Sequence, residues 1–142
     1  MNRRRQKKLS RKLVEAARFE VVGAVRALML AGADPNYADT DGSTPLYAAA
    51  VGGAADAVAC LLDAGASPDV ESRDETEGTP LCAAAAWGHA DVVRLLLAHG
   101  ADPDLREDDG EGLSPLEWAR KGDHTETAEI LLAAGARSDG RS

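Results

Sequence analysis

Acidic side chains gather in three short polar segments, which are the first places to look for chemistry. A calcium-binding loop needs the spacing Asp-x-Asp-x-Asp-Gly with a later Glu, because those side chains must converge on one ion. None of the three segments has that spacing. We therefore expect no metal site among these carboxylates: Asp39, Asp41, Glu71, Asp74, Glu75, Glu77, Glu107, Asp108, Asp109 and Glu111.

Catalytic patterns are also missing from the sequence. The three histidines, His89, His99 and His124, stand apart from one another at no metal-ligand spacing. There is no glycine-rich phosphate loop and no nucleophile elbow. Acid–base catalysis needs positioned groups with perturbed pKa values, whereas these carboxylates lie on polar connecting segments. We expect no enzyme activity, no cofactor and no small-molecule substrate.

The cysteines and the apolar pattern indicate a compartment. Cys60 and Cys82 each fall inside an apolar stretch, and no Cys-x-x-Cys pair is present, which favours a reducing cytosol. Glu15, Glu20 and Arg26 interrupt the apolar run that follows the basic N-terminus, so a secretion signal is not expected. No run approaches the ~20 apolar residues of a membrane span. We predict a cytoplasmic protein without a membrane span.

Charge is spread unevenly along the 142 residues, whose formal net charge is −8. Residues 1–12 hold seven of the 16 basic residues and no acid, so the other nine face 24 acids and the remainder carries −15. Such a body repels nucleic acid and favours basic partners. We predict residues 1–12 to be a disordered, solvated head. The alternatives are that it contacts nucleic acid or anionic lipid, or folds onto its own acidic segments. The residues concerned are Arg3, Arg4, Arg5, Lys7 and Lys8.

Three motifs recur in a fixed order. Gly-Ala-Asp-Pro occurs at 32–35 and 100–103, with variants at 65–68 and 135–138, at steps of 33, 35 and 35 residues. Thr-Pro-Leu or Ser-Pro-Leu begins at Thr44, Thr79 and Ser114. An apolar pattern of helical spacing precedes each glycine. A repeat of this length is typical of a stack of similar supersecondary units.

Each unit predicts two short helices. The Thr or Ser hydroxyl can cap the first helix, and Pro suits its first position. An Ala-rich helix then runs through 48–50 or 83–86 and ends at Gly53 or Gly88. A second helix follows at about 56–64 and 91–99. Neither helix pair can bury its apolar face alone, so the units must stack.

At this point the sequence resembles the ankyrin repeat family, whose signature is Thr-Pro-Leu-His-x-Ala. The match lies at 44–49 and 79–84, and the resemblance covers residues 13–138. It implies an all-α ankyrin-repeat solenoid of about four stacked helix-turn-helix units with short β-hairpin-like connecting tips. The units are 13–36, 37–69, 70–104 and 105–138, followed by a tail, 139–142.

The sequence departs from the family at the signature histidine, which Tyr47, Cys82 and Glu117 replace. In the family that histidine ties adjacent units together. Its absence implies weaker coupling or a different bonding arrangement. The tips before Thr79 and Ser114 are also two residues longer than the tip before Thr44.

The family resemblance implies binding through the tips and the concave face of the first helices. Trp87 is the expected anchor, because Trp is enriched at interface hot spots. Phe19 shares its repeat position. The alternatives are that Trp87 covers its own loop and that Phe19 packs beneath the N-terminal helix. Trp118 is expected in the core. The predicted partner-binding residues are Phe19, Thr40, Asp41, Val51, Glu75, Glu77, Trp87, Asp108, Asp109, Glu111 and Lys121.

These observations predict a monomeric protein–protein interaction module. The acidic tips either steer a partner with a basic surface or only keep the protein soluble. Two other functions stay open. One is a regulator whose basic head contacts an anionic surface such as nucleic acid, which the acidic body disfavours. The other is a non-catalytic subunit that stabilises an enzyme partner.

Overall fold

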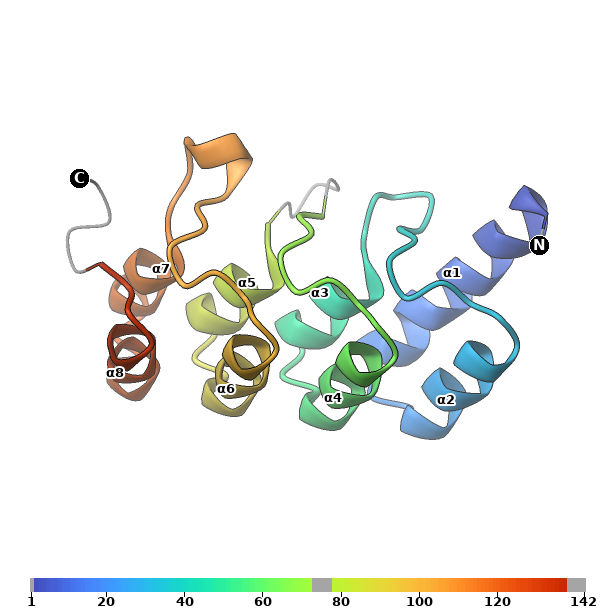
Figure 1. Cartoon of the computed structure of the whole chain (residues 1–142), viewed down its shortest axis with the longest axis horizontal. Coiled ribbons are helices and arrows are strands. Elements are labelled where there is room, and N and C mark those ends of the chain that lie inside the picture. The colour runs from blue at the N-terminus through green and yellow to red at the C-terminus, as the bar shows by residue number, and fades with distance from the viewer. Residues whose placement is uncertain (1, 73–77, 138–142) are drawn as a thin grey trace.

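The computed structural model describes residues 2–72 and 78–137, and the α-helices within them form two layers (Figure 1). The first helix of each pair packs on the first helix of the next pair, and the second helices pack in the same way. This confirms the all-α repeat solenoid. The first-helix layer contains α1 (Arg3–Arg18), α3 (Pro45–Val51), α5 (Pro80–Ala86) and α7 (Pro115–Lys121). The second-helix layer contains α2 (Val22–Leu30), α4 (Ala55–Asp63), α6 (Ala90–Ala98) and α8 (Thr125–Ala133).

The predicted caps start three of the four first helices. The hydroxyl of Thr44 accepts a hydrogen bond from the backbone N–H of Tyr47 at 3.2 Å, and Thr79 does the same for Cys82 at 3.1 Å. Ser114 goes further, because the Glu117 carboxylate also accepts the Ser114 N–H at 3.1 Å. This reciprocal pair is a capping box. The repeated Thr-Pro and Ser-Pro motifs therefore fix where each unit begins.

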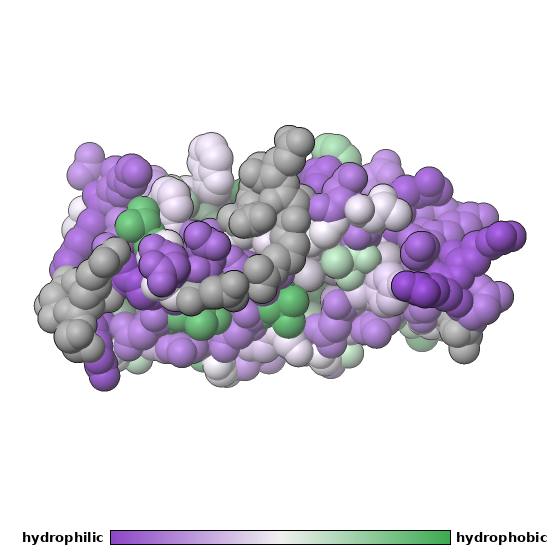
Figure 2. All heavy atoms as spheres, turned by 90° about the horizontal axis from the view of Figure 1, so that it is seen from above, coloured by the Kyte–Doolittle hydropathy of each residue, from purple (hydrophilic) through white to green (hydrophobic). Residues whose placement is uncertain are grey.

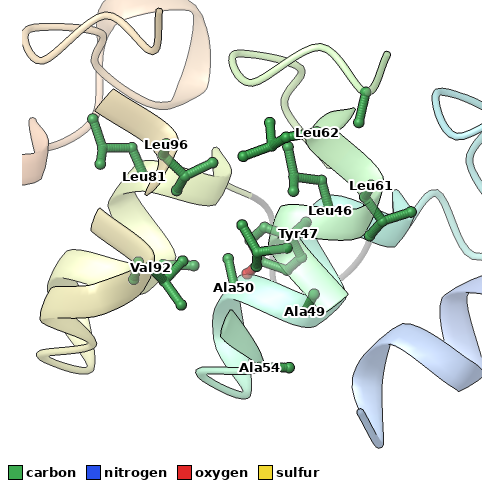
Figure 3. Close-up of a cluster of buried hydrophobic side chains, with 14 of the residues drawn as sticks. Leu46, Tyr47, Ala49, Ala50, Ala54, Leu61, Leu62, Leu81, Val92 and Leu96 are labelled. Carbon is green, nitrogen blue, oxygen red and sulfur yellow. The ribbon is translucent and has the colours of Figure 1, made fainter. Parts of the chain in front are cut away.

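The core is a continuous row of small and branched apolar side chains between successive units. Leucines at one repeat position in every unit are fully buried, and so are the alanines that follow them on the first helices. Small alanines let the helices approach closely, which is how a core with few aromatic residues reaches full packing. Figure 3 shows Leu46, Ala49 and Ala50 on the first helix of one unit, and Leu81 and Leu96 in the next unit of the same cluster.

A ladder of side-chain bonds joins the connecting segments of successive units. The Asn36 Oδ1 accepts the Ser67 N–H at 2.7 Å, while its Nδ2 donates to the Gly65 carbonyl at 3.1 Å. The same repeat position links the later units through carboxylates: Asp69 to the Asp102 N–H at 3.1 Å, and Asp104 to the Arg137 N–H at 2.9 Å. Each of these side chains forms a hydrogen bond with a backbone group of the next unit that would otherwise bond only to water.

The prediction of a disordered head is wrong for residues 3–12, because α1 begins at Arg3. The Asn2 side chain caps the helix by accepting the Arg5 N–H at 2.8 Å. Gln6 then takes the ladder position of Asn36, donating to the Gly32 carbonyl at 3.0 Å. Leu9 is buried against the first unit. These contacts hold the head as part of the first unit, whose helical structure starts before residue 13.

Histidines elsewhere in the repeat form side-chain hydrogen bonds between successive units. The His89 Nε2 donates to the Val51 carbonyl at 3.1 Å, and the His124 Nε2 donates to the Ala86 carbonyl at 3.0 Å. Each bond runs from one unit to the end of the first helix in the unit before it. The second unit has Ala54 at this position, so the first junction lacks the bond.

These imidazole rings occupy the space beside a glycine in the preceding unit. Gly53 has φ 68°, in the left-handed region where glycine is favoured. A Cβ at Gly53 would lie 2.6 Å from the His89 Nδ1. The backbone therefore favours glycine at this position, and the His89 ring of the next unit crowds the place where a Cβ would lie.

The connecting tips contain no strand within residues 2–72 and 78–137, where the sequence led us to expect short β-hairpins. One isolated antiparallel bridge joins Ser72 to Gly78. In the other two tips the Asp39 N–H donates to the Ser43 carbonyl at 2.9 Å, and the Glu107 N–H donates to the Leu113 carbonyl at 3.2 Å. The third tip also forms a 3₁₀ turn, η1 (Asp108–Gly110). The extra residues of this tip therefore fold into a turn rather than a strand.

Gly53→Ala should destabilise the protein by about 1–2 kcal/mol from backbone strain alone, with a further loss from the His89 ring. We expect a double-mutant cycle with His89→Ala to show positive coupling, because removing the ring relieves the second loss. Urea denaturation followed by circular dichroism would measure both. Equal losses in the two backgrounds would contradict the proposed clash.

The amides of residues 6–12 should exchange slowly with deuterium, because they lie in the ordered first turns of α1. Hydrogen–deuterium exchange with peptide mass spectrometry would measure this, with peptides from the rest of α1 as the internal reference. Complete exchange of the head at the earliest time point, beside protected amides in the rest of α1, would contradict the ordered helix.

Candidate functional site

A groove of about 370 Å³ lies between α5 and α7 on the first-helix layer. Both walls come from exposed or half-buried side chains of consecutive units, so stacking creates the groove. Figure 2 looks down on the tips and shows mainly hydrophilic residues on that face, with small apolar areas between them. The groove is lined by Tyr47, Cys82, Ala83, Ala86, Trp87, Glu107, Trp118, Lys121 and Gly122.

Trp87 forms one wall of the groove. It is the cap residue directly after α5, and 65% of its surface is exposed. The same repeat position holds Gly52 in the unit before and Gly122 in the unit after, so no bulky neighbour covers the indole. The structure thus leaves a large apolar ring open to solvent, as the sequence led us to expect of an anchor.

Trp118 differs from the sequence-based expectation. It was expected in the core because it aligns with Ala48 and Ala83, yet it is only half-buried. An indole is far larger than the alanine of the neighbouring units, so it packs on the core with one side and lines the groove with the other. Its Nε1–H donates to the Glu107 carboxylate. The Lys121 Nζ lies 5.5 Å from the centre of its ring, a cation–π contact.

Glu107 brings a charge into the groove and was not predicted from the sequence as part of it. Partial burial raises the pKa of its carboxyl group, the indole of Trp118 and the thiol of Cys82 lower it, and the carboxylate of Glu71 raises it. The repeat alignment does not indicate a role for Glu107 in the groove, because the same repeat position holds Asp39 and Ser72 in the earlier tips. The signal that could have found it is the bulky Trp118 eleven residues later, which needs a partner for its N–H.

Cys82 forms part of the floor of the groove. Burial raises the pKa of its thiol. The sulfur lies 3.8 Å from the Leu105 carbonyl and 3.7 Å from the Leu113 carbonyl, and its single S–H can donate to one acceptor at a time. A thiol held protonated in this way is a poor nucleophile. We therefore assign Cys82 a packing role.

An ion pair joins the third tip to α7. The Arg106 guanidinium lies 2.6 Å from the Glu117 carboxylate. The pKa of Glu117 is lowered, first by the hydrogen bond from the Ser114 backbone and then by Arg106. Glu107 and Glu117 thus sit in opposite electrostatic surroundings, although both flank Trp118.

The predicted residues at the end of the first helices are not all brought together. Lys121 lines the groove with Trp87. Phe19 is 68% exposed and lies instead in a separate apolar hollow at the outer end of the first unit, beside Leu28. Val51 is half-buried, and its carbonyl is bonded by the histidine of the next unit.

The predicted tip residues are exposed where the structure describes them: Thr40, Asp41, Asp108 and Glu111. The Asp41 N–H donates to the Asp39 carboxylate at 3.0 Å, and the Asp108 N–H donates to the Glu71 carboxylate at 2.8 Å. The second bond joins the bases of two successive tips. Glu75, Glu77 and the side chain of Asp109 lie outside the described residues.

The basic side chains of the head are exposed on α1, at the far end of the array from the groove (Figure 1). They are Arg3, Arg4, Arg5, Lys7 and Lys8. Nothing in the described residues joins them to the groove. Within residues 2–72 and 78–137, no group of three His, Cys, Asp or Glu side chains could hold a metal ion. No helix in that part of the chain has the length and apolar character to cross a membrane.

Comparison with known families gives one result. A family model described as ankyrin repeats, in three copies, matches residues 13–107 and again residues 68–142. The two overlapping matches agree with the stacked helix pairs of the structure. Comparison with curated proteins found no match.

Glu107→Gln should gain stability relative to the native chain as the pH rises. A raised pKa means that the Glu107 carboxyl ionises less readily in the folded protein than in the unfolded chain. The native chain therefore loses stability as the pH rises from the ordinary pKa of 4.5 through the raised pKa of the folded state. Gln stays neutral and can still accept the Trp118 N–H. Melting curves from pH 4 to pH 8 should show a relative gain on the order of a few degrees.

The matched control for this pH series is Glu129→Gln, an exposed carboxylate on α8. That variant should follow the native chain across the series. A Glu107→Gln melting temperature that falls further below the native value as the pH rises would contradict the assignment.

Proposed function

The chain belongs to the ankyrin repeat family, and from that premise we propose that it binds a partner protein along the first helices and the tips. Ankyrin repeats generally serve as protein–protein interaction modules. In this proposal the first-helix layer is the concave binding face. The protein is a non-catalytic, cytoplasmic adaptor or regulator that is monomeric before it meets its partner.

The observation that carries the proposal is the exposed indole of Trp87 on the wall of a groove. An indole that is 65% exposed forgoes the stabilisation that burial of so large an apolar surface would give. Tryptophan at the centre of an interface is the commonest hot-spot residue, with a loss of ~2 kcal/mol or more on truncation. The exposed position of Trp87 on a rigid scaffold therefore favours its insertion into the surface of a partner as an anchor.

The tips supply the selectivity in this proposal. Asp41, Asp108 and Glu111 are exposed on the tips, and the face seen from the side of the tips is mainly hydrophilic (Figure 2). The bond between Asp108 and Glu71 orders the third tip against the second. An ordered acidic edge attracts a basic surface and orients it before contact, and salt weakens this effect.

A second candidate function rests on the ordered head. Its basic side chains project from a helix rather than from a flexible tail, so they present charge in a fixed arrangement. Such a surface would hold an anionic partner through charge neutralisation. The stabilising-subunit alternative shares the binding face of the main proposal, and the identity of the partner would separate the two.

Trp87→Ala should abolish or strongly reduce capture of the partner from extracts of the native host, by tenfold or more in recovered protein. The matched control is Leu30→Ala, which removes an equally apolar side chain that is 90% exposed on the second-helix layer. Quantitative mass spectrometry of the captured proteins measures both. Partner recovery that is undiminished in Trp87→Ala, or equally diminished in Leu30→Ala, would contradict the anchor.

The same capture experiment carries two further arms. If the acidic tips orient the partner, recovery of the partner should fall as the salt concentration is raised. Recovery that does not change with salt concentration would contradict a role for the tips in binding. A Lys7→Glu, Lys8→Glu variant should keep the partner. Loss in that variant, with capture intact in Trp87→Ala, would favour the head as the binding surface.

A further inference from the structure

The groove between α5 and α7 holds a carboxylate that the described residues leave without a cation. The groups that act on Glu107 are the Trp118 indole and the Cys82 thiol, which donate hydrogen bonds, and the Glu71 carboxylate, which repels it. The nearby Arg106 guanidinium is engaged by Glu117 instead. A half-buried carboxylate with another carboxylate as its charged neighbour is unfavourable, and a cation placed beside it would relieve that cost.

The walls of the groove suit a cation that is also flat. Trp87 and Trp118 both line the groove and present indole surfaces. The Lys121 Nζ already lies 5.5 Å from the centre of the Trp118 ring, which shows that this ring face accepts a positive charge. Lys121 is exposed and reaches the ring on a flexible stem, so it can move away without disturbing α7.

Given the protein-binding function above, we propose that this groove binds an arginine side chain from a basic segment of the partner protein. The guanidinium lies against the indoles of Trp87 and Trp118, in place of the Lys121 ammonium, and donates to the Glu107 carboxylate. Arginine fits better than lysine because its guanidinium is planar, stacks on aromatic rings and donates to a carboxylate through two parallel hydrogen bonds. The groove, at about 370 Å³, has room for one such side chain.

The test uses the full chain and a capped pentapeptide, Gly-Ser-Arg-Ser-Gly, with citrulline and lysine versions as probes. Citrulline keeps the shape of arginine and removes its charge. The chain has two tryptophans, so its NMR spectrum contains two indole N–H signals. One signal comes from the Trp118 N–H, which donates a hydrogen bond to Glu107. Both signals should shift on titration with the arginine peptide. The citrulline peptide should bind with an affinity lower by about tenfold or more.

Variants of the chain then locate the site. Glu107→Gln keeps an acceptor for the Trp118 N–H but loses the charge, so arginine-peptide affinity should fall about tenfold. Glu129→Gln makes the same change on α8, away from the groove, and should leave affinity unchanged. Lys121→Met removes the internal cation and should bind at least as tightly as the native chain. Melting curves would confirm that each variant is folded.

Several results would overturn the arginine site: no indole shift with the arginine peptide, equal binding of arginine and citrulline peptides, or full affinity in Glu107→Gln. A loss of binding in Lys121→Met would overturn the exchange of one cation for another. If a partner is captured through Trp87 yet the arginine peptide does not bind, the arginine site fails and the protein-binding function stands. If the peptide binds yet capture ignores Trp87, the protein-binding proposal fails at this face.

Discussion

The structure depends on one constraint, which is that no helix pair in this chain can complete its own core. Leucines such as Leu61 and Leu96 are fully buried only because a neighbouring unit lies against them. The corresponding Leu28 of the first unit lacks a unit before it within the described chain and remains half-exposed. The ladder bonds and the histidine bonds follow from the same constraint, since they satisfy polar groups that stacking brings together. The groove is a further product of stacking, because its walls belong to two successive units.

Local features of the fold were predictable, because they are encoded within a few residues. The hydroxyl caps at Thr44 and Thr79 depend on an amide three residues away, and the glycine stops depend on a single backbone conformation. The head was harder to predict. Its sequence is strongly basic, yet Gln6 bonds to the Gly32 carbonyl and Leu9 is buried in the core. These contacts depend on the stacked fold. Charge composition alone favoured the opposite outcome.

The candidate site was predictable only in part. Repeat alignment correctly indicated that Trp87 is exposed, because exposure at the end of a first helix is a property of the repeat position. The same reasoning was right only in part for Trp118, which packs against the core but is half-buried, because alignment with an alanine does not predict where the rest of an indole lies. Glu107 was noted only as one of the acidic tip residues, because its place in the groove depends on Trp118 and on the path of a tip that is longer than its counterpart. The electrostatics of the groove therefore emerged only with three-dimensional packing.

The pairing of a glycine in one unit with a histidine in the next has a consequence for how such a chain can evolve. Gly53 and Gly88 each make room for an imidazole from the following unit, whereas Glu20 occupies that place before the second unit, which carries Ala54 instead. Units are thus matched to the neighbour that succeeds them. Duplication of the third unit in place would preserve the match, because that unit carries both Gly88 and His89, but a shuffled order that set a histidine after Glu20 would not. Permutation of the repeats is restricted by this contact, although the units look interchangeable in outline.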